Sequence, residues 1–499
     1  MQIEVRSLDR LQGKNAYDLG PVLSSLAEAV KASGLDPVKL RVVCDWMQYR
    51  HNFRDAVQVR SIQPSALEVA RPLRGGSSNG NGDNHDAYEI AIDLRRAKPE
   101  QIERAIASIS DGADGTKGRQ YLEPWHRISD SCIWDFNSLY WNALGLWEEA
   151  TGQEYEQALP GGESDARNAE AARDLILELF RIWDDLSARK ALPQDLHVLE
   201  LGVGNGNQAR VWLDEFQRLD REHRGEYYRR LHYLMGDYSP HVLERARQNV
   251  NEHADHISSL VLDARTPSRT LGFLRGKAFL IYISNVYDNL PTDEVVRIGG
   301  HVFNVEVRAY LSATAANSIG ETYGIPPHEI PDLVGRLLQL GPELLSRAVP
   351  NLFPEPLIAV KFWGEVWESL RLEERYVPIE GLDIYDVAPG IGGEVLRPVI
   401  EANGDLRMHI SNGAAASFLD SLPLLHPFGM LQCHDIIVTD VEQYSRSFRG
   451  PGKYDGSVVN WVNGPLLAAI ARRKGYEVAF RSFQRSGSNI ITLTSRVQD

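Results

Sequence analysis

A glycine-rich turn that links an apolar segment to an amphipathic one is the clearest candidate in this sequence for ligand binding. The segment VLELGVGNGNQARVWLDEF spans residues 198–216. Gly202, Gly204 and Gly206 directly follow its apolar strand, and apolar residues three and four positions apart then predict a helix. Glycines let the backbone bend sharply and approach a ligand, and the first turn of a helix offers unpaired N–H groups. We therefore expect a cofactor at this junction between strand and helix.

The spacing of these glycines separates two classes of cofactor. A dinucleotide site has the pattern G-x-G-x-x-G, but here Asn207 stands where its last glycine would be. The G-x-G-x-G form, with Glu200 on the preceding strand, resembles motif I of class I S-adenosyl-L-methionine (SAM) methyltransferases. The resemblance implies that SAM is the cofactor, that the glycine loop carries its methionine part and that Glu200 helps to hold it. A purely structural glycine turn is the alternative interpretation.

Two aspartates end the next two predicted strands. Asp237 closes LHYLMGD and is followed by Ser239 and Pro240, a typical start of a helix. A carboxylate at this strand end can accept hydrogen bonds from both hydroxyls of a ribose. Asp263 closes SLVLD, where SAM-binding folds commonly place a polar side chain on the adenine amino group. Each aspartate alone is more often a turn or cap residue, but the two together favour a nucleoside site.

The fourth predicted strand carries a more specific signature. The segment FLIYISNVYDNLPTDEV resembles the [A/S]-N-E-x-x-D-[A/N]-L-P element of the MidA family of SAM-dependent methyltransferase-like proteins. The matching residues are Ser284, Asn285, Asp288, Asn289, Leu290 and Pro291. Val286 stands in the place of the family's glutamate, a group that could orient or deprotonate the acceptor. Mitochondrial relatives in this family methylate a protein arginine, but the resemblance is too distant to carry that substrate across.

Weaker matches extend this resemblance over residues 120–499. FNVEVR resembles the segment that follows the signature in the family, and MLQCHDII resembles the family's fifth strand with Asp435 at its aspartate. Asn460 and Trp461 match the last two places of the family's D-x-T-x-x-V-[DN]-[FW] region. The family's threonine and histidine in that region are replaced by residues 456–458. The resemblance implies a distant MidA-like relation.

The acceptor should lie over the carboxyl ends of the fourth and fifth strands. We take Asn285, Asp288 and Asp435 as candidate catalytic residues, and Asn285 also as a cofactor contact. Asp288 could instead be a helix-start carboxylate. His434 could serve as a base, although a lone histidine on a strand is more often a core group. The sequence predicts no metal site.

The order of the predicted elements indicates one doubly wound sheet. Short apolar strands alternate with helices after residue 196, which predicts a parallel sheet covered on both faces. We expect a seven-stranded, Rossmann-like α/β core of the class I methyltransferase type. The predicted division is an N-terminal α/β module (1–115), an aromatic-rich helical connector (116–190), the SAM-binding core (191–300 and 425–499) and an inserted cap that binds the acceptor (301–424).

Three local features complete this expectation. The N-terminal module should contain a strand at 66–71 and a polar loop at 75–86. The pair Asn403-Gly404 predicts a hairpin inside the insertion. The tryptophans and tyrosines between residues 125 and 147 should pack between helices, with a substrate cage as the alternative.

Composition excludes several classes of protein. The 499 residues are 43% hydrophobic and 24% charged, which is typical of a globular chain. The net charge of −15 would repel phosphate backbones, so we expect no nucleic-acid partner. Three widely spaced cysteines predict neither a disulfide framework nor a zinc site, and no secretory signal or membrane span is recognised. A cytoplasmic protein without a membrane partner is expected, and its oligomeric state, including a homodimer, is left open.

The sequence thus favours a SAM-dependent methyltransferase that acts on a protein side chain or a small molecule. A SAM-binding scaffold or assembly factor without turnover is the first alternative, because Val286 replaces the family's glutamate. A nicotinamide oxidoreductase is the second, and the spacing of the glycines disfavours it.

Overall fold

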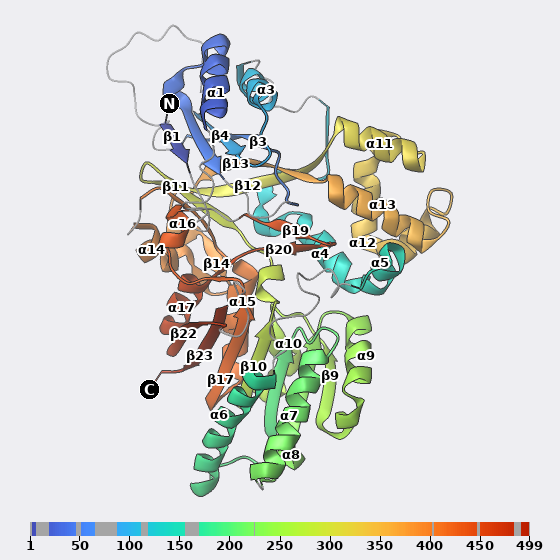
Figure 1. Cartoon of the computed structure of the whole chain (residues 1–499), viewed down its shortest axis with the longest axis vertical. Helices are drawn as coiled ribbons and strands as arrows, with labels where there is room; N and C mark the ends of the chain where they lie inside the picture. Colours follow the sequence, from blue (N-terminus) through green and yellow to red (C-terminus); the bar gives the residue numbers. More distant parts are fainter. Residues whose placement is uncertain are drawn as a thin grey trace.

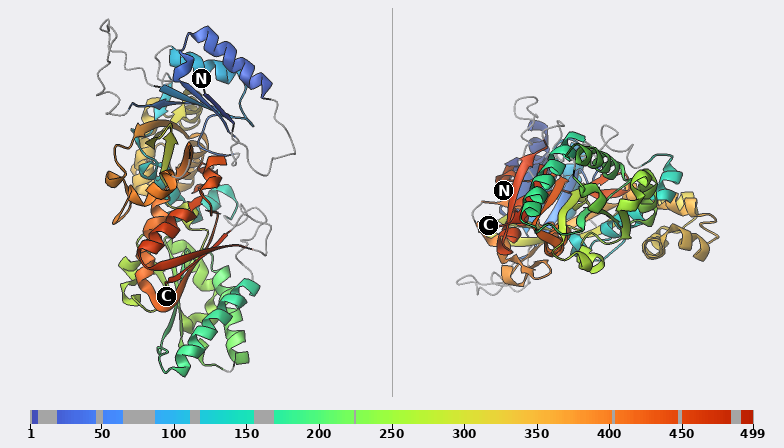
Figure 2. Two further views of the ribbon diagram at one scale, coloured as in Figure 1. Left: turned by 90° about the vertical axis from the view of Figure 1, so that its left-hand side faces the viewer. Right: turned by 90° about the horizontal axis from the view of Figure 1, so that it is seen from below.

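The computed structural model describes ten stretches of the chain. They are residues 2–5, 19–45, 51–64, 87–110, 118–154, 169–223, 225–401, 404–446, 450–483 and 491–498. Two large sheets organise these residues, and Figures 1 and 2 show one sheet above the other along the long axis of the molecule. None of the helices in the described stretches combines the length and the apolar composition that crossing a bilayer requires.

The lower sheet has seven strands in the order β22-β23-β17-β10-β7-β8-β9. Their bounds are β7 (Leu196–Leu201), β8 (Leu231–Asp237), β9 (Ile257–Val261), β10 (Ala278–Ser284), β17 (Leu425–Asp435), β22 (Tyr476–Ser482) and β23 (Ile491–Val497). Strands β9, β8, β7, β10 and β17 are parallel, whereas β23 runs antiparallel to both of its neighbours. In chain order this sheet reads 3-2-1-4-5-7-6, which confirms the predicted class I methyltransferase core.

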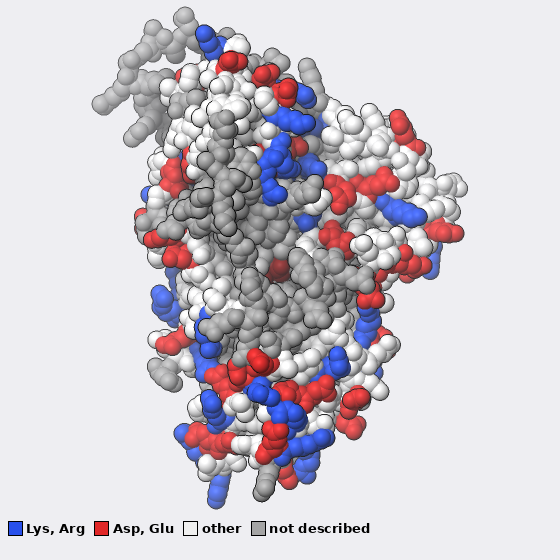
Figure 3. Space-filling model, in the orientation of Figure 1, with Lys and Arg blue, Asp and Glu red and all other residues white. Residues whose placement is uncertain are grey.

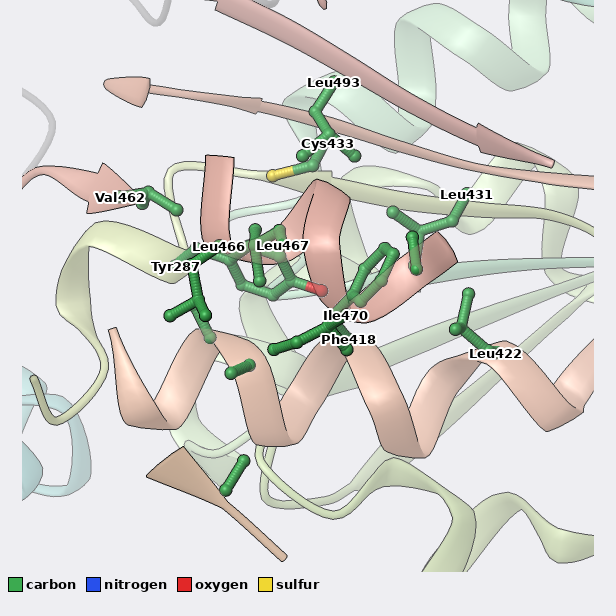
Figure 4. Packing of buried hydrophobic residues seen from close by; sticks show 14 of the residues in the cluster. Tyr287, Phe418, Leu422, Leu431, Cys433, Val462, Leu466, Leu467, Ile470 and Leu493 are labelled. Atoms are coloured by element: carbon green, nitrogen blue, oxygen red, sulfur yellow. The ribbon is translucent and has the colours of Figure 1, made fainter. Parts of the chain in front are cut away.

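Helices cover both faces of this sheet. Helices α6 (Ala169–Ala188), α7 (Asn207–His223) and α9 (Pro240–Asn249) bury a cluster of large aromatic residues against one face. Helices α10 (Pro267–Leu271), α15 (Asn412–Ser421) and α17 (Gly464–Arg473) bury an aliphatic cluster against the other. Figure 4 shows this second cluster, with Leu466, Leu467 and Ile470 of α17 and Phe418 of α15 near Cys433 and Leu431 of β17. Burial of apolar surface on both faces stabilises the sheet, and with it the strands whose ends form the candidate site.

The upper sheet combines N-terminal strands with strands of the expected connector and insertion and with one strand, β11, from the end of the first core segment. Its path is β1-β2-β4-β3-β13-β12-β11-β16, with β5 and β6 also paired to β12. The bounds are β1 (Gln2–Val5), β2 (Leu40–Asp45), β3 (Val57–Ile62), β4 (Ala87–Asp93), β5 (Arg119–Tyr121), β6 (His126–Arg127), β11 (Glu294–Ile298), β12 (His301–Ser312), β13 (Arg371–Pro378) and β16 (Leu406–His409). Ser61 and Ile62 of β3 pair with Arg375 and Tyr376 of β13. The predicted domain boundaries stay a prediction, but the N-terminal and inserted strands share hydrogen bonds in one sheet.

Two groups of helices pack around the upper sheet. Helices α1 (Gly20–Ser33) and α3 (Pro99–Ser110) cover the N-terminal strands. Helices α4 (Ile133–Asn142), α5 (Leu144–Thr151), α11 (Ala313–Tyr323), α12 (Ile330–Ala348) and α13 (Pro356–Ser369) form the arm on the right of Figure 1. Trp134, Phe136, Tyr140 and Trp147 are buried in the core of this arm, so these four pack between helices. Trp125 instead lies against the guanidinium groups of Arg308 and Arg375 in the upper sheet.

The hairpin β19 (Gly452–Tyr454) and β20 (Ser457–Val459) inserts its tip into this aromatic arm. The Asp455 carboxylate accepts hydrogen bonds from the Tyr140 hydroxyl at 2.8 Å and from the Trp147 indole N–H at 3.1 Å. The Trp367 indole N–H donates to the Asp455 carbonyl at 2.7 Å. A segment close to the C-terminus therefore joins the core sheet to α4, α5 and α13.

Some local expectations fail or fall outside the described residues. The strand expected at 66–71 and the loop expected at 75–86 lie outside them, as does Asn403. The hairpin predicted at Asn403-Gly404 is wrong, because the preceding element is the helix α14 (Arg397–Glu401) and β16 pairs with β11. An Asn-Gly pair marks a hairpin only when two strands flank it. Here a helix precedes the pair, and β16, which follows it, lies at the edge of the upper sheet.

Candidate active site at the carboxyl edge of the core sheet

The glycine turn between β7 and α7 adopts a conformation that requires glycine. Gly202, Gly204 and Gly206 have φ angles of +73°, +56° and +81°, which side chains other than glycine rarely tolerate. A Cβ on Gly206 would lie 2.8 Å from the backbone Cα of Ala246 in α9. The Gly202 amide donates to the Gly236 carbonyl at 2.8 Å, which fastens the turn to β8. The turn is therefore held by its backbone, and α9 approaches Gly206 so closely that the turn has no room for a side chain there.

Asp237 lies at the end of β8 and reaches this turn. Its Oδ2 accepts a hydrogen bond from the Gly204 amide at 3.3 Å, and its Oδ1 accepts one from the Ser239 amide at 3.0 Å. Burial raises the pKa of the Asp237 carboxyl to about 6, against the pull of these backbone hydrogen bonds. The structure thus brings together two residues that the sequence predicted for one site, Gly204 and Asp237.

Glu200 on β7 faces the interior instead. Its side chain is 2% exposed, and its Oε2 accepts a hydrogen bond from the Tyr233 hydroxyl at 2.6 Å. Burial raises the pKa of Glu200 to about 8, despite the hydrogen bond from Tyr233. The structure therefore places Glu200 beneath the glycine turn and not on its surface.

Asp263 lies two residues beyond β9 and binds its own neighbour. Its carboxylate accepts hydrogen bonds from the Arg265 amide at 2.8 Å and from Nη2 of that guanidinium at 2.7 Å. Burial alone would raise the pKa of Asp263, but the hydrogen bonds and charge of Arg265 outweigh it and lower the pKa. Sequence reasoning missed Arg265, which competes for Asp263 with any adenine amino group.

The end of β10 turns back over the glycine turn. Asn285 adopts a left-handed φ of +53°, and its amide donates to the His434 carbonyl at 2.9 Å. Val286 then lies directly against Gly202: a Cβ on that glycine would overlap the Cγ2 of Val286. Asparagine is one of the few residues that adopts this conformation at modest cost. The left-handed turn at Asn285 therefore directs Val286 onto the first glycine.

Asp435 supports the short helix that follows. The 3-10 helix η6 (Tyr287–Asn289) begins with two amides that donate to Asp435 Oδ2, from Tyr287 at 2.9 Å and from Asp288 at 3.3 Å. Asp435 Oδ1 accepts from the Ile436 amide at 2.7 Å. The side chain has no exposed area, and burial together with the charge of Asp288 raises its pKa well above the ordinary value. Asp435 therefore positions η6 from within the core.

Asp288 is buried but lies closer to the surface. It is 8% exposed, and its Oδ1 accepts a hydrogen bond from the Asn289 side-chain amide at 2.8 Å. Burial raises the pKa of Asp288 to about 6. Among the residues proposed to contact the methyl acceptor, Asp288 is the carboxyl whose pKa lies near neutrality and whose side chain is not wholly buried.

Residues from distant segments complete the support of η6. The Asn460 amide donates to the Asp288 carbonyl, and the Asn137 side chain donates to the Asn289 carbonyl, both at 2.9 Å. Asn137 Oδ1 also accepts from the Val458 amide at 2.9 Å. Sequence reasoning missed Asn137, because a single asparagine within an aromatic helix carries no signal of its distant partners.

His434 sits in a satisfied, buried environment. Its Nδ1 lies 2.9 Å from the Thr492 hydroxyl, its Nε2 lies 3.1 Å from the Gln432 amide, and it is 3% exposed. Burial lowers the pKa of His434 to about 4. His434 therefore has the surroundings of a buried core residue, which the sequence offered as the alternative to a catalytic base.

These residues fit an adenosyl cofactor at the carboxyl edge of β7 and β8. The three glycines bring backbone without side chains of its own to this edge, and Asp237 offers a carboxylate beside the Gly204 amide. Open α/β sheets bind ligands outside the carboxyl ends of their strands, where the strand order reverses. Strands β7 and β10 form that reversal point here.

The central part of the chain matches a known protein family. Residues 175–333 match the model of a family described as "Putative S-adenosyl-L-methionine-dependent methyltransferase". No curated protein matches the sequence. Among solved structures, the chain is similar to a "likely methyl transferase" from Burkholderia thailandensis bound to S-adenosyl-homocysteine, at 12% identity and a TM-score of 0.45 over 78% of this chain and 91% of that one.

A second similar structure is the CcbJ methyltransferase from Streptomyces caelestis, at 11% identity and a TM-score of 0.31. The similarity covers 73% of this chain and 99% of that one. The family match over residues 175–333 supports the predicted resemblance to SAM-dependent methyltransferases and the SAM cofactor that the sequence predicted.

Proposed function

We propose that this chain is a methyltransferase that binds SAM over its glycine turn and transfers the methyl group to a protein side chain or a small molecule. One observation carries the proposal: the Asp237 carboxylate meets the Gly204 amide at the edge where three glycines have positive φ. A carboxylate beside a turn without Cβ atoms is suited to hold a nucleoside by its ribose hydroxyls.

The residues of the chain would bind and orient, because the cofactor itself supplies an activated methyl group. Gly202, Gly204 and Gly206 would let the backbone approach the cofactor, and ionised Asp237 would accept hydrogen bonds from the ribose. Catalysis then depends on holding the acceptor in line and excluding water. The upper sheet and the helical arm stand over this edge in Figure 1 and would supply the acceptor's surroundings.

Asp288 is our candidate for contact with the acceptor. Its carboxyl has a pKa near 6, so at neutral pH it is largely ionised and can accept a hydrogen bond. Asp435, Asn137 and Asn460 hold the backbone of η6 and would fix the position of Asp288. We assign these three a positioning role.

One observation favours a second candidate function, a SAM-binding scaffold without turnover. Val286 covers Gly202 and brings no polar atom to the place where the related family has a glutamate. A site built in this way could bind the cofactor and still lack a group that activates an acceptor.

Methyl transfer itself distinguishes the two candidates. The full chain is incubated with methyl-labelled SAM and an extract of cells that make the protein, while S-adenosylhomocysteine binding is measured in parallel. Binding together with a labelled acceptor supports the enzyme, and saturable binding without transferred label supports the scaffold. A rise in melting temperature with NAD(H) and none with SAM would contradict both.

A further inference from the structure

The order of the strands indicates which way a cofactor would extend from the glycine turn. In the core sheet β7 lies next to β8, and β8 lies next to β9. The ribose of SAM carries the methionine portion on one side and the adenine on the other. With the methionine portion on the turn after β7 and the ribose at Asp237, the adenine would extend past the end of β9. The Leu262 amide donates to the Asp237 carbonyl at 2.9 Å, so the segment after β9 begins beside the ribose position.

Arg265 holds a guanidinium in this segment. Its Nε donates to Asp263 Oδ1 at 3.1 Å and its Nη2 donates to Asp263 Oδ2 at 2.7 Å, a two-pronged contact that fixes the plane of the group. The Arg265 amide donates to the same Oδ1 at 2.8 Å and closes the turn between the two residues. The side chain of Arg265 is 50% exposed. The guanidinium is therefore held in one orientation while half of the side-chain surface stays accessible.

The surroundings of Arg265 suit a flat, uncharged ring. A guanidinium stacks on aromatic rings through its planar face, and such a contact leaves the bonds to Asp263 intact. Tyr238 directly follows Asp237 and is 42% exposed. Hydrogen bonding to Asp263 raises the pKa of Arg265, and the nearby Tyr238 phenol raises it further. The end of β8 thus adds an aromatic side chain near the guanidinium.

Direct contact between Asp263 and the adenine amino group is less favourable in this geometry. Both carboxylate oxygens of Asp263 already accept hydrogen bonds from the guanidinium. An uncharged amino group would have to share or displace a charged donor, and charge-assisted hydrogen bonds are about twice as strong as neutral ones. Stacking on the guanidinium requires no such exchange.

We propose that Arg265 binds the adenine of the cofactor by stacking on its face, and that Asp263 is a positioning residue that holds the guanidinium in place. This inference rests on the proposed function, because it requires the ribose to lie at Asp237. Recognition through the face of a ring tolerates changes at its edge. The amino group of the adenine should therefore contribute little through Asp263.

Affinity for S-adenosylhomocysteine tests the role of Arg265. Arg265→Ala should weaken binding by about tenfold, the size of one stacking contact. Arg265→Lys keeps the charge without the planar group and should lose about as much. Arg269→Ala removes an exposed arginine of the neighbouring helix α10 and should bind like the parent. Unchanged or stronger binding by Arg265→Ala would overturn the inference, as would full affinity in Arg265→Lys.

A double-mutant cycle tests whether Asp263 acts through Arg265. Asp263→Ala should weaken binding by about tenfold in the parent and cause little further loss in the Arg265→Ala background. A loss of the same size in both backgrounds would mean that Asp263 contacts the cofactor directly or only supports the fold, and would overturn the positioning role.

A modified ligand separates stacking from contact with the amino group. The ligand is S-adenosylhomocysteine with hydrogen in place of the adenine amino group. The ratio of its dissociation constant to that of S-adenosylhomocysteine should agree within about threefold between the parent and Asp263→Ala. A ratio that is large in the parent and falls in Asp263→Ala would assign the amino group to Asp263 and overturn the inference. Absence of S-adenosylhomocysteine binding by the unmodified chain would instead contradict the proposed function.

Discussion

The Asp237 carboxylate accepts a hydrogen bond from the Gly204 amide at 3.3 Å, and this contact joins the end of β8 to the glycine turn after β7. The two residues come from neighbouring parallel strands whose pairing runs from Leu196 with Leu231 to Leu201 with Gly236. The register of the sheet thus places a carboxylate beside the turn. A bound ribose would replace the contact between the Gly204 amide and this carboxylate with hydrogen bonds from its hydroxyls.

Affinity for S-adenosylhomocysteine should depend on the ionisation of Asp237. Because burial raises the pKa of this carboxyl to about 6, it is ionised at pH 7.5 and protonated at pH 5. The protonated form accepts hydrogen bonds from the ribose less well, so affinity should fall as pH drops through about 6. Titration calorimetry from pH 5 to 8 measures this, with Asp237→Asn as the control whose affinity should vary less. A flat profile in the unmodified chain would exclude the ionised carboxylate as a ligand.

Glu200 should govern stability at high pH and leave cofactor binding unchanged at pH 7. Its pKa rises from an ordinary 4.5 to about 8 in the folded state. The associated stabilisation is therefore complete below pH 4.5 and is lost as pH rises to about 8. Relative to Glu200→Gln, the free energy of unfolding of the parent chain should fall by about 1.4 kcal/mol per pH unit in this window.

Urea unfolding of both chains at pH 5, 6, 7 and 8 checks this slope. A parallel pair of stability curves would mean that Glu200 is ionised in the folded state. A large loss of S-adenosylhomocysteine affinity in Glu200→Gln at pH 7 would instead restore Glu200 as a direct ligand, as the sequence predicted.

Gly202 and Val286 should be energetically coupled. Gly202→Ala adds backbone strain at a φ of +73° and also overlaps the Val286 side chain. Gly276→Ala is the matched control, since Gly276 has a φ of +69° with no atom within 4 Å of the added Cβ. We expect the control to lose about 1 kcal/mol and Gly202→Ala to lose about 2 kcal/mol more. In a double-mutant cycle Val286→Ala should recover about 1 to 2 kcal/mol of that excess, whereas additive effects would show that the two do not touch.

Removal of the Asp435 carboxylate should destabilise the fold severely. Asp435→Ala would leave the buried amides of Tyr287 and Asp288 and the partly buried amide of Ile436 without their acceptor. We expect a loss of about 3 kcal/mol or more in the free energy of unfolding. Asp440→Ala is the control, because Asp440 is exposed and accepts a single amide from Glu442; it should lose less than about 1 kcal/mol. Similar losses in the two variants would contradict the role of Asp435 in holding η6.

Local sequence patterns predicted the core sheet and the glycine turn because both depend on neighbouring residues. Alternating apolar strands and helices specify parallel pairing, and the helix start after Asp237 follows from Ser239, whose hydroxyl accepts from the Val242 amide at 3.4 Å. The approach of Asp237 to Gly204 then follows from the strand order. These parts of the fold required no long-range information.

The upper sheet could not be predicted in the same way, because its pairs lie far apart in the chain. Arg60 on β3 binds Glu374 on β13 at 2.7 Å, and Arg407 on β16 binds the same carboxylate at 2.9 Å. All three are at most 3% exposed, although arginine and glutamate on a strand usually indicate a solvent face. Their burial depends on pairing among themselves, which no local pattern reveals.

The surroundings of the residues proposed to contact the methyl acceptor could not be predicted from the sequence either. A histidine and an aspartate at the end of β17 suggested chemistry, but His434 is bonded to Thr492 and Asp435 to backbone amides. Strand periodicity shows which face a residue occupies, not which partners lie across it. Only the packed structure separates the positioning residue Asp435 from the candidate acceptor contact Asp288.

Titration of the full chain with S-adenosylhomocysteine, together with Asp237→Ala and the control Asp440→Ala, tests the cofactor site most directly. We predict saturable binding by the parent and by Asp440→Ala, and binding weakened by roughly 1 to 3 kcal/mol in Asp237→Ala, which leaves the ribose hydroxyls without their acceptor. Failure of the parent chain to bind, or equal affinity in Asp237→Ala, would contradict a SAM site at the glycine turn.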